Sequence, residues 1–178
     1  SSFEFPQQVT GICGLNGRGK TNLLDAIYYC CFTKSYFTNS DALNVHFNKE
    51  GFRLEAAFYN NGKDQQVVCI HRGSVKKEFL LNGIPYEKLS AHIGLLPVVM
   101  IAPDDIELIT GTSESRRRFI DTVMSQVDAA YLLELIHYNK ILQQRNSLLK
   151  KMDTVESGSA TVLDILDEQL IPVGSSIH

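Results

Sequence analysis

The stretch from Gly14 to Thr21 constrains this chain more than any other feature. It reads Gly-Leu-Asn-Gly-Arg-Gly-Lys-Thr and matches G-x-x-x-x-G-K-[ST], the pattern of a phosphate-binding loop. Glycines let backbone N–H groups converge on phosphate oxygens, and the helix that follows adds partial positive charge. An apolar stretch, Gln8 to Cys13, precedes the loop, and an amphipathic one, Lys20 to Phe32, follows it. The sequence therefore predicts a strand, a phosphate loop and a helix, in that order.

Two side chains of this loop have a defined chemical task. Lys20 is placed to reach the β and γ phosphates of a nucleotide, and the Thr21 hydroxyl is placed to ligate Mg²⁺. We therefore expect ATP and Mg²⁺ as cofactors. The residues expected to bind the nucleotide are Asn16, Gly17, Arg18, Gly19, Lys20, Thr21 and Asn22.

A P-loop protein also needs an acidic residue after another core strand to hold Mg²⁺. The β-branched run Pro97 to Ile101 predicts a central strand, and Asp104 follows it as the candidate ligand, although Ala102 and Pro103 intervene. A second run, Leu163 to Glu168, ends in two acids, but its apolar spacing is helical. No complete set of catalytic acids is expected in this chain, so we predict that it is inactive alone.

The remaining pattern predicts an α/β fold. Alternation and turn residues indicate an antiparallel meander of three strands, residues 52–59, 66–72 and 75–81. Helical spacing predicts one or two helical turns at 86–92 and helices at 113–127, 131–151 and 162–170, with Pro172 ending the last helix. A linker is expected at 153–161. We expect an ATPase lobe with a β-subdomain over residues 1–105 and a helical lobe over residues 106–178.

Composition and charge limit which partners and which cellular compartment this chain is expected to have. No apolar run approaches the ~18 residues of a membrane helix, so no membrane association is expected. The four cysteines form no C-x-x-C pair, which favours reduced core residues and a cytoplasmic protein. The net charge of −3 gives no support for nucleic-acid binding from bulk basicity. Residues 116–151, however, carry seven Lys or Arg against three acids, and residues 152–178 carry five acids and no Lys or Arg.

The basic stretch admits two interpretations. Arg145, Lys150 and Lys151 near the end of a long helix either follow a DNA backbone or form a favourable helix C-terminus. Arginines 116 to 118 spread over about 200° of a helix, so each either contacts DNA phosphate, or a nucleotide across a dimer, or belongs to a solvated face. Asn139 and Asn146 lie on an otherwise apolar stripe, which favours a device that sets the register of a helical hairpin over a ligand site.

Several stretches in combination resemble the RecF family of DNA replication and repair ATPases, within the ABC-type ATPase heads of the SMC group. The resemblance rests on residues 14–27 (GLNGRGKTNLLDAI), 102–111 (APDDIELITG), 115–121 (SRRRFID), 144–150 (QRNSLLK) and 167–170 (DEQL). It covers essentially the whole chain.

This resemblance implies a P-loop NTPase fold of ABC/SMC type with a helical lobe II. It further implies an ATP-dependent homodimer that binds DNA at single-strand gaps and junctions, supports recombinase loading and the SOS response, and works with other recombination mediator proteins. The signature motif and Walker B acids of the family are expected outside this chain. The family often has basic residues just after Ser35, where this chain has Tyr36 and Phe37.

Two other classes stay open at this point. A small-molecule phosphotransferase would need a lid with paired arginines, and the antiparallel strands argue against it. A structural SMC-like tether would need a long coiled coil, and the helix at 131–151 is short for that role.

Overall fold

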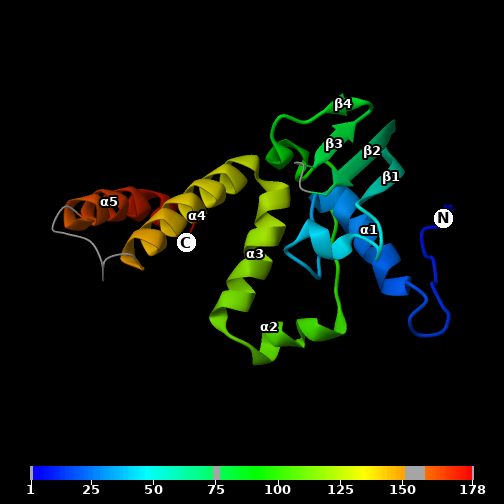
Figure 1. Ribbon diagram of the computed structural model, residues 1–178, viewed down its shortest axis with the longest axis horizontal. Coiled ribbons are helices and arrows are strands. Elements are labelled where there is room, and N and C mark those ends of the chain that lie inside the picture. The colour runs from blue at the N-terminus through cyan, green and yellow to red at the C-terminus, as the bar shows by residue number, and fades with distance from the viewer. Residues whose placement is uncertain (1, 74–76, 151–158, 178) are drawn as a thin grey trace. The chain divides into compact units, whose positions relative to one another are not determined.

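The computed structural model describes residues 2–73, 77–150 and 159–177. The chain divides into two compact units, residues 1–89 and residues 90–178. The first holds helix α1 (Lys20–Phe32) and a four-stranded sheet, and the second holds helices α2 to α5 (Figure 1). This is the predicted α/β arrangement with an antiparallel sheet and a helical region. The lobe boundary expected at residue 105 stays a prediction.

The sheet is an antiparallel meander with the strand order β1-β2-β3-β4. Its strands are β1 (Gly51–Asn60), β2 (Lys63–Arg72), β3 (Glu78–Leu81) and β4 (Ile84–Pro85). The two residues between β1 and β2, Asn61 and Gly62, have φ values of 51° and 76°, which is the two-residue hairpin turn that Asn-Gly favours. The meander is confirmed, except that residues 75 and 76 of its third predicted strand lie outside the described residues. The two-residue β4 was not predicted.

Helix α1 packs against β1 and β2 through its C-terminal half. Five consecutive residues there, Tyr28 to Phe32, are buried. The Tyr29 ring meets the ring of Phe52 on β1 edge to face, with the ring centres 5.6 Å apart. The fully buried residues Val67, Cys69 and Phe79 of β2 and β3 complete this core. The predicted helix after the phosphate loop is thus confirmed.

The two predicted core strands at residues 8–13 and 97–101 are wrong. Both segments are irregular in the structure, and Val9, Val99 and Ile101 are 89%, 70% and 81% exposed. A β-strand requires hydrogen-bonding neighbours, and β1 to β4 form the sheet of the described residues without pairing to either segment. Apolar composition alone therefore does not make these segments strands.

The helical unit contains α2 (Glu107–Thr110), α3 (Ser113–Val127), α4 (Ala129–Leu149) and α5 (Ser159–Ile177). Helices α4 and α5 form an antiparallel hairpin, in which Gly174 lies against the Tyr138 ring. The predicted end of the last helix at Pro172 is wrong, because α5 continues through it. The turn after Pro172 packs onto α4, with Ile177 buried, and this packing offsets the backbone hydrogen bond that proline removes.

Most of the predicted linker at residues 153–161 lies outside the described residues. Among the residues that are described, no helix combines the length and apolar character needed to cross a membrane.

Candidate nucleotide site

The phosphate loop depends on glycine for its backbone shape. Gly17 and Gly19 have φ values of 77° and 84°, a region that L-residues with side chains rarely adopt. A Cβ atom at either position would meet no atom within 4 Å. Conformation, and not lack of space, is therefore what requires glycine here, and the loop faces open solvent.

Lys20 folds back over the loop that precedes it. Its Nζ donates hydrogen bonds to the carbonyl oxygens of Gly14, at 2.8 Å, and Leu15, at 2.9 Å. These oxygens hold the ammonium group above the loop, where phosphate oxygens would compete for it. Lys20 is thus positioned by its own loop for an anionic ligand.

The start of α1 supplies the backbone donors of an anion site. Gly19 is the N-cap residue and offers no side-chain cap, and the first turn contains no acid. The first amide to bond back is that of Leu23, to Gly19 O at 3.0 Å. The amides of Lys20, Thr21 and Asn22 therefore have no helical acceptor, and nothing in this turn neutralises the positive end of the helix dipole.

The other predicted ligands are placed as follows. Asn16, Gly17, Arg18, Gly19, Thr21 and Asn22 are all exposed. Asp104 belongs to the second unit and lies exposed in a short 3₁₀ helix, Pro103–Ile106. The neighbouring Asp105 accepts a hydrogen bond from the Ala102 amide at 2.5 Å. The roles of Thr21 and Asp104 toward Mg²⁺ stay predictions.

Asp25 anchors the chain that follows α1, and sequence reasoning missed this role. Its Oδ1 accepts from the Tyr36 amide and its Oδ2 from the Ser35 hydroxyl, both at 2.7 Å. The Ser35 oxygen in turn accepts from the amides of Phe37 and Thr38, at 3.1 Å each. One carboxylate on the nucleotide-site helix thus fixes four residues. The available signal was an acid inside an otherwise apolar helical run.

A second missed cluster closes the C-terminal end of α1. Lys77 Nζ donates to Thr33 O at 2.7 Å and to Tyr29 Oη at 3.0 Å, and it lies 3.1 Å from Asp41 Oδ2. Tyr29 donates to Asp41 Oδ1 at 2.6 Å. The cation therefore meets the carbonyl end of the helix, where the dipole favours it.

This cluster changes the titration of its acids. Burial raises the pKa of the Tyr29 hydroxyl, and the hydrogen bond to Asp41 raises it further. Burial also opposes the charged form of Asp41, but the hydrogen bonds from Tyr29 and Lys77 and the charge of Lys77 outweigh it and lower the pKa of Asp41. Lys77 and Asp41 are consequently a charged pair in the folded protein.

The candidate DNA-binding residues on α4 separate into different environments. Arg145 donates from both Nε and Nη2 to the carboxylate of Asp167 on α5, and this hydrogen bond lowers the pKa of Asp167. Lys150 follows α4 and is exposed, while Lys151 lies outside the described residues. Arg145 thus joins two helices, whereas Lys150 faces solvent.

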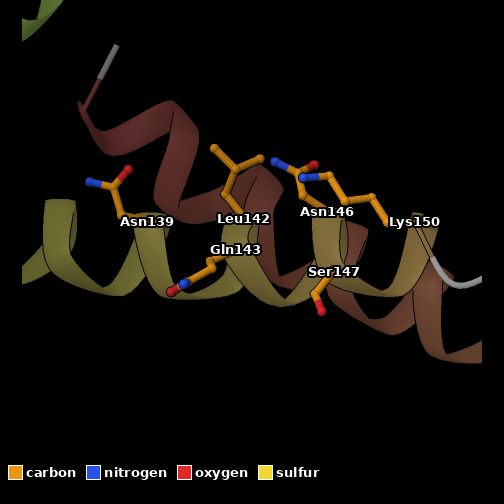
Figure 2. Close-up of a pocket in the computed structure, with 6 residues that line it drawn as sticks. All are labelled: Asn139, Leu142, Gln143, Asn146, Ser147 and Lys150. Atoms are coloured by element: carbon orange, nitrogen blue, oxygen red, sulfur yellow. The ribbon is translucent and has the colours of Figure 1, made fainter.

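Lys150 shares a shallow hollow along α4 with amide and hydroxyl side chains (Figure 2). The residues that line it are Asn139, Leu142, Gln143, Asn146, Ser147 and Lys150. The predicted register role of Asn139 and Asn146 is wrong, because both are exposed, whereas Tyr138, Ile141 and Arg145 lie on the less exposed face. Among the described residues, the hollow contains donors and acceptors with one cation and no carboxylate.

The three consecutive arginines of α3 also differ from one another. Arg116 donates to Gly111 O at 3.2 Å, and Arg118 pairs with Glu114 one turn earlier at 3.1 Å. Arg117 is exposed. Two of the three arginines therefore have local structural partners.

Comparison with known proteins places this geometry in a family. The model of the AAA domain family matches residues 1–170. The chain is 41% identical over 177 residues to the DNA replication and repair protein RecF of Flavobacterium johnsoniae, covering 99% of this chain and 49% of the relative. It is 40% identical over 178 residues to RecF of Parabacteroides distasonis, covering 100% and 48%.

Solved structures of RecF proteins are also similar to this chain. The recombination mediator protein RecF-ATP in the RecFOR pathway superposes with a TM-score of 0.80 at 31% identity, covering 92% of this chain and 44% of that one. The corresponding RecF-ATPrS structure gives a TM-score of 0.83.

The fold and the loop thus define a P-loop NTPase of the AAA class, of ABC/SMC type, as predicted. The chain belongs to the RecF family, which confirms the resemblance seen in its sequence. It spans about half the length of the curated relatives it matches.

Proposed function

We propose that this chain binds ATP with Mg²⁺ at residues 16–22, as part of a RecF-type protein of DNA replication and repair. The observation that carries the proposal is the open start of α1, where three amides without helical acceptors follow a glycine loop, with the Lys20 ammonium held by carbonyls of that loop. The likeness to a RecF-ATP structure supports the choice of ATP. In this site Mg²⁺ would meet Thr21, and Asp104 is the second candidate ligand.

For the whole protein we propose ATP-dependent homodimerisation and binding to DNA at single-strand gaps and junctions. The same proposal includes recombinase loading, a contribution to the SOS response, contact with recombination mediator proteins and a cytoplasmic site of action. Hydrolysis would reset the dimer and perform no chemistry on DNA. The names of the relatives support a role in DNA replication, repair and recombination mediation. Lys150 and the amide side chains of the α4 hollow, together called the α4 surface, support contact with DNA.

Amide NMR signals test the nucleotide site. Adding ATP and Mg²⁺ should shift the signals of Gly17, Gly19 and Lys20, because phosphate oxygens would take up their donors. Lys20→Ala should remove most of the response, whereas Lys63→Ala, an exposed lysine on β2, should leave it unchanged. Unmoved signals in a folded sample at saturating ATP would refute the site.

DNA binding is tested on α4. Lys150→Ala should weaken duplex binding and reduce the salt slope by about 0.9, the value for one phosphate neutralised on duplex DNA. Lys63→Ala is again the matched control. Arg145→Ala should chiefly loosen the α4–α5 hairpin, since its guanidinium is engaged by Asp167. Duplex affinity independent of salt would exclude this surface.

ATP turnover by the chain alone should not exceed that of Lys20→Ala. Phosphoryl transfer needs charge stabilisation from both sides of the phosphate chain, and the proposed site supplies one side. Phosphate release clearly above this control would show that Asp104, Asp105 or Asp167 and Glu168 act as catalytic acids.

A further inference from the structure

The segment of residues 34–49, between α1 and β1, exposes large apolar side chains to an unusual degree. Phe37 is 47% exposed, Leu43 75% and Phe47 89%. Two aromatic rings thus meet solvent within 16 residues of one connection. Single exposed apolar residues are common on protein surfaces, but exposed aromatic rings gathered in one segment indicate a binding surface.

Contacts with α1 hold the first part of this segment in place. Ser35 and Tyr36 are bonded to Asp25, and the Tyr36 ring meets Tyr28 edge to face at 5.2 Å. The Phe37 ring then packs edge to face on Tyr36, also at 5.2 Å. Phe37 is therefore an exposed ring on a fixed base, so little conformational entropy is lost when it binds a ligand.

Hydrogen bonds within the segment shape its second part. A 3₁₀ helix, Asp41–Asn44, is followed by a turn in which the Lys49 amide bonds to His46 O at 3.0 Å. Asn48 has a φ of 62°, a left-handed conformation that asparagine tolerates. This turn displays Phe47, the most exposed ring of the segment.

The charges of the segment favour an anionic ligand. Lys34 and Lys49 are both exposed. Of the two acids in the connection up to β1, Asp41 already pairs its carboxylate with Lys77, and Glu50, beside Lys49, is exposed. Exposed rings together with an excess of exposed lysines over exposed acids match the chemistry of single-stranded nucleic acid, which offers free base faces and a charged backbone.

We propose that residues 34–49 bind single-stranded DNA, with unpaired bases stacking on Phe37 and Phe47 and phosphates meeting Lys34 and Lys49. The inference rests on the proposed DNA-binding function and adds a site separate from α4. Bases of a duplex are stacked on one another and are not free to stack on protein rings. The segment should consequently prefer single strands, whereas the α4 surface should bind the backbone of a duplex.

Fluorescence anisotropy with a labelled oligothymidine and with a duplex of equal length tests this site. Phe47→Ala should weaken single-strand binding about 5- to 150-fold, the range for losing one stacked base, and leave duplex binding unchanged. Phe47→Tyr should retain most of the affinity because it keeps the ring. Tyr59→Ala removes a comparably exposed ring of β1, 77% exposed, and should have no effect.

Photocrosslinking gives a second readout. Oligonucleotides carrying 5-bromodeoxyuridine should crosslink to Phe37 or Phe47. In salt titrations, Lys34→Ala and Lys49→Ala should each reduce the single-strand salt slope by about 0.7. Equal losses for single strands and duplex in Phe47→Ala, or no loss, would overturn the proposal and assign the rings to a protein contact. If Lys150→Ala leaves duplex binding intact while Phe47→Ala impairs single-strand binding, the α4 proposal fails and this one stands.

Discussion

The two ends of α1 differ in burial and in the partners of their polar groups. At the N-terminal end, Thr21 and Asn22 are exposed, the loop glycines face open space and Lys20 bonds to carbonyls of its own loop. At the C-terminal end, five consecutive residues are buried and Lys77, Asp41 and Tyr29 close the helix. The open end is free for a ligand because the buried end anchors the helix to the sheet.

This contrast means that stability and binding depend on different residues of one helix. Variants at the buried end should change the free energy of unfolding. Variants at the open end should change the response to nucleotide and little else. Asp25 lies between the two and is the place where both effects are expected.

The largest effect on stability is expected for Lys77→Met. Removing this cation leaves the Asp41 carboxylate without its counter-charge and the Thr33 carbonyl without its side-chain donor, which should cost about 3 kcal/mol of unfolding free energy. Urea unfolding followed by circular dichroism measures the loss, with Lys63→Met as the exposed control. The double variant with Asp41→Asn should recover part of it, since no charge is then stranded. A loss below about 0.5 kcal/mol would contradict the anchoring role.

Asp25→Ala should have an intermediate effect, about 2 kcal/mol, because the Ser35 hydroxyl and the Tyr36 amide lose a charged acceptor. Asp25→Asn keeps one acceptor oxygen and should lose less. Nucleotide affinity should also fall in Asp25→Ala if the segment after α1 steadies the loop. Unchanged stability in Asp25→Ala would show that solvent replaces both hydrogen bonds.

The alkaline response should be smaller and should involve the buried end. Burial raises the pKa of the Cys30 thiol to about 12 and that of Cys69 to about 11. A folded pKa above the unfolded value of 9.0 gives stability that is complete below pH 9 and is lost as the pH rises toward 11 or 12.

Comparing urea unfolding at pH 8 and pH 9.8 checks this response. Cys30→Ala should be less stable than the parent at pH 8, because it leaves a small cavity, but should lose about 1 kcal/mol less on going to pH 9.8. Cys13→Ala, at the exposed cysteine before the loop, should follow the parent at both values. An identical loss in Cys30→Ala would assign the alkaline response to Cys69 or to the buried tyrosines.

Local signals predicted the fold where neighbours in the chain decide it. The loop and α1 follow from the Gly-Lys-Thr pattern, and the β1–β2 hairpin follows from Asn61 and Gly62. Prediction failed where distant partners decide the structure. Apolar residues 97–101 suggested a strand, yet the Val98 amide bonds to the side chain of Gln126 at 2.8 Å. Pro172 suggested a helix end, yet packing on α4 continues α5 beyond it.

The residues of the candidate site also differ in whether the sequence alone could reveal them. Lys20 and Thr21 could be found from spacing, because their partners lie within a few residues. Lys77 could not be found, since its partners lie 36 to 48 residues earlier in the chain. Likewise Arg145 belongs to a basic stretch in the sequence, while in the structure it is held by an acid of the next helix.

The smallest effect on folding is expected for Lys20→Ala. Its two hydrogen bonds are exposed, and its cation lies at the positive end of the helix, where the dipole disfavours it. The change in unfolding free energy should stay within about 0.5 kcal/mol. With ATP and Mg²⁺, however, the parent should gain stability in proportion to the logarithm of the ligand concentration above its Kd, and the variant should gain almost none. Thermal unfolding with and without nucleotide separates the two quantities. A variant that lost stability as Lys77→Met does, or that kept the nucleotide-dependent gain, would show that the two ends of α1 are not divided between binding and anchoring.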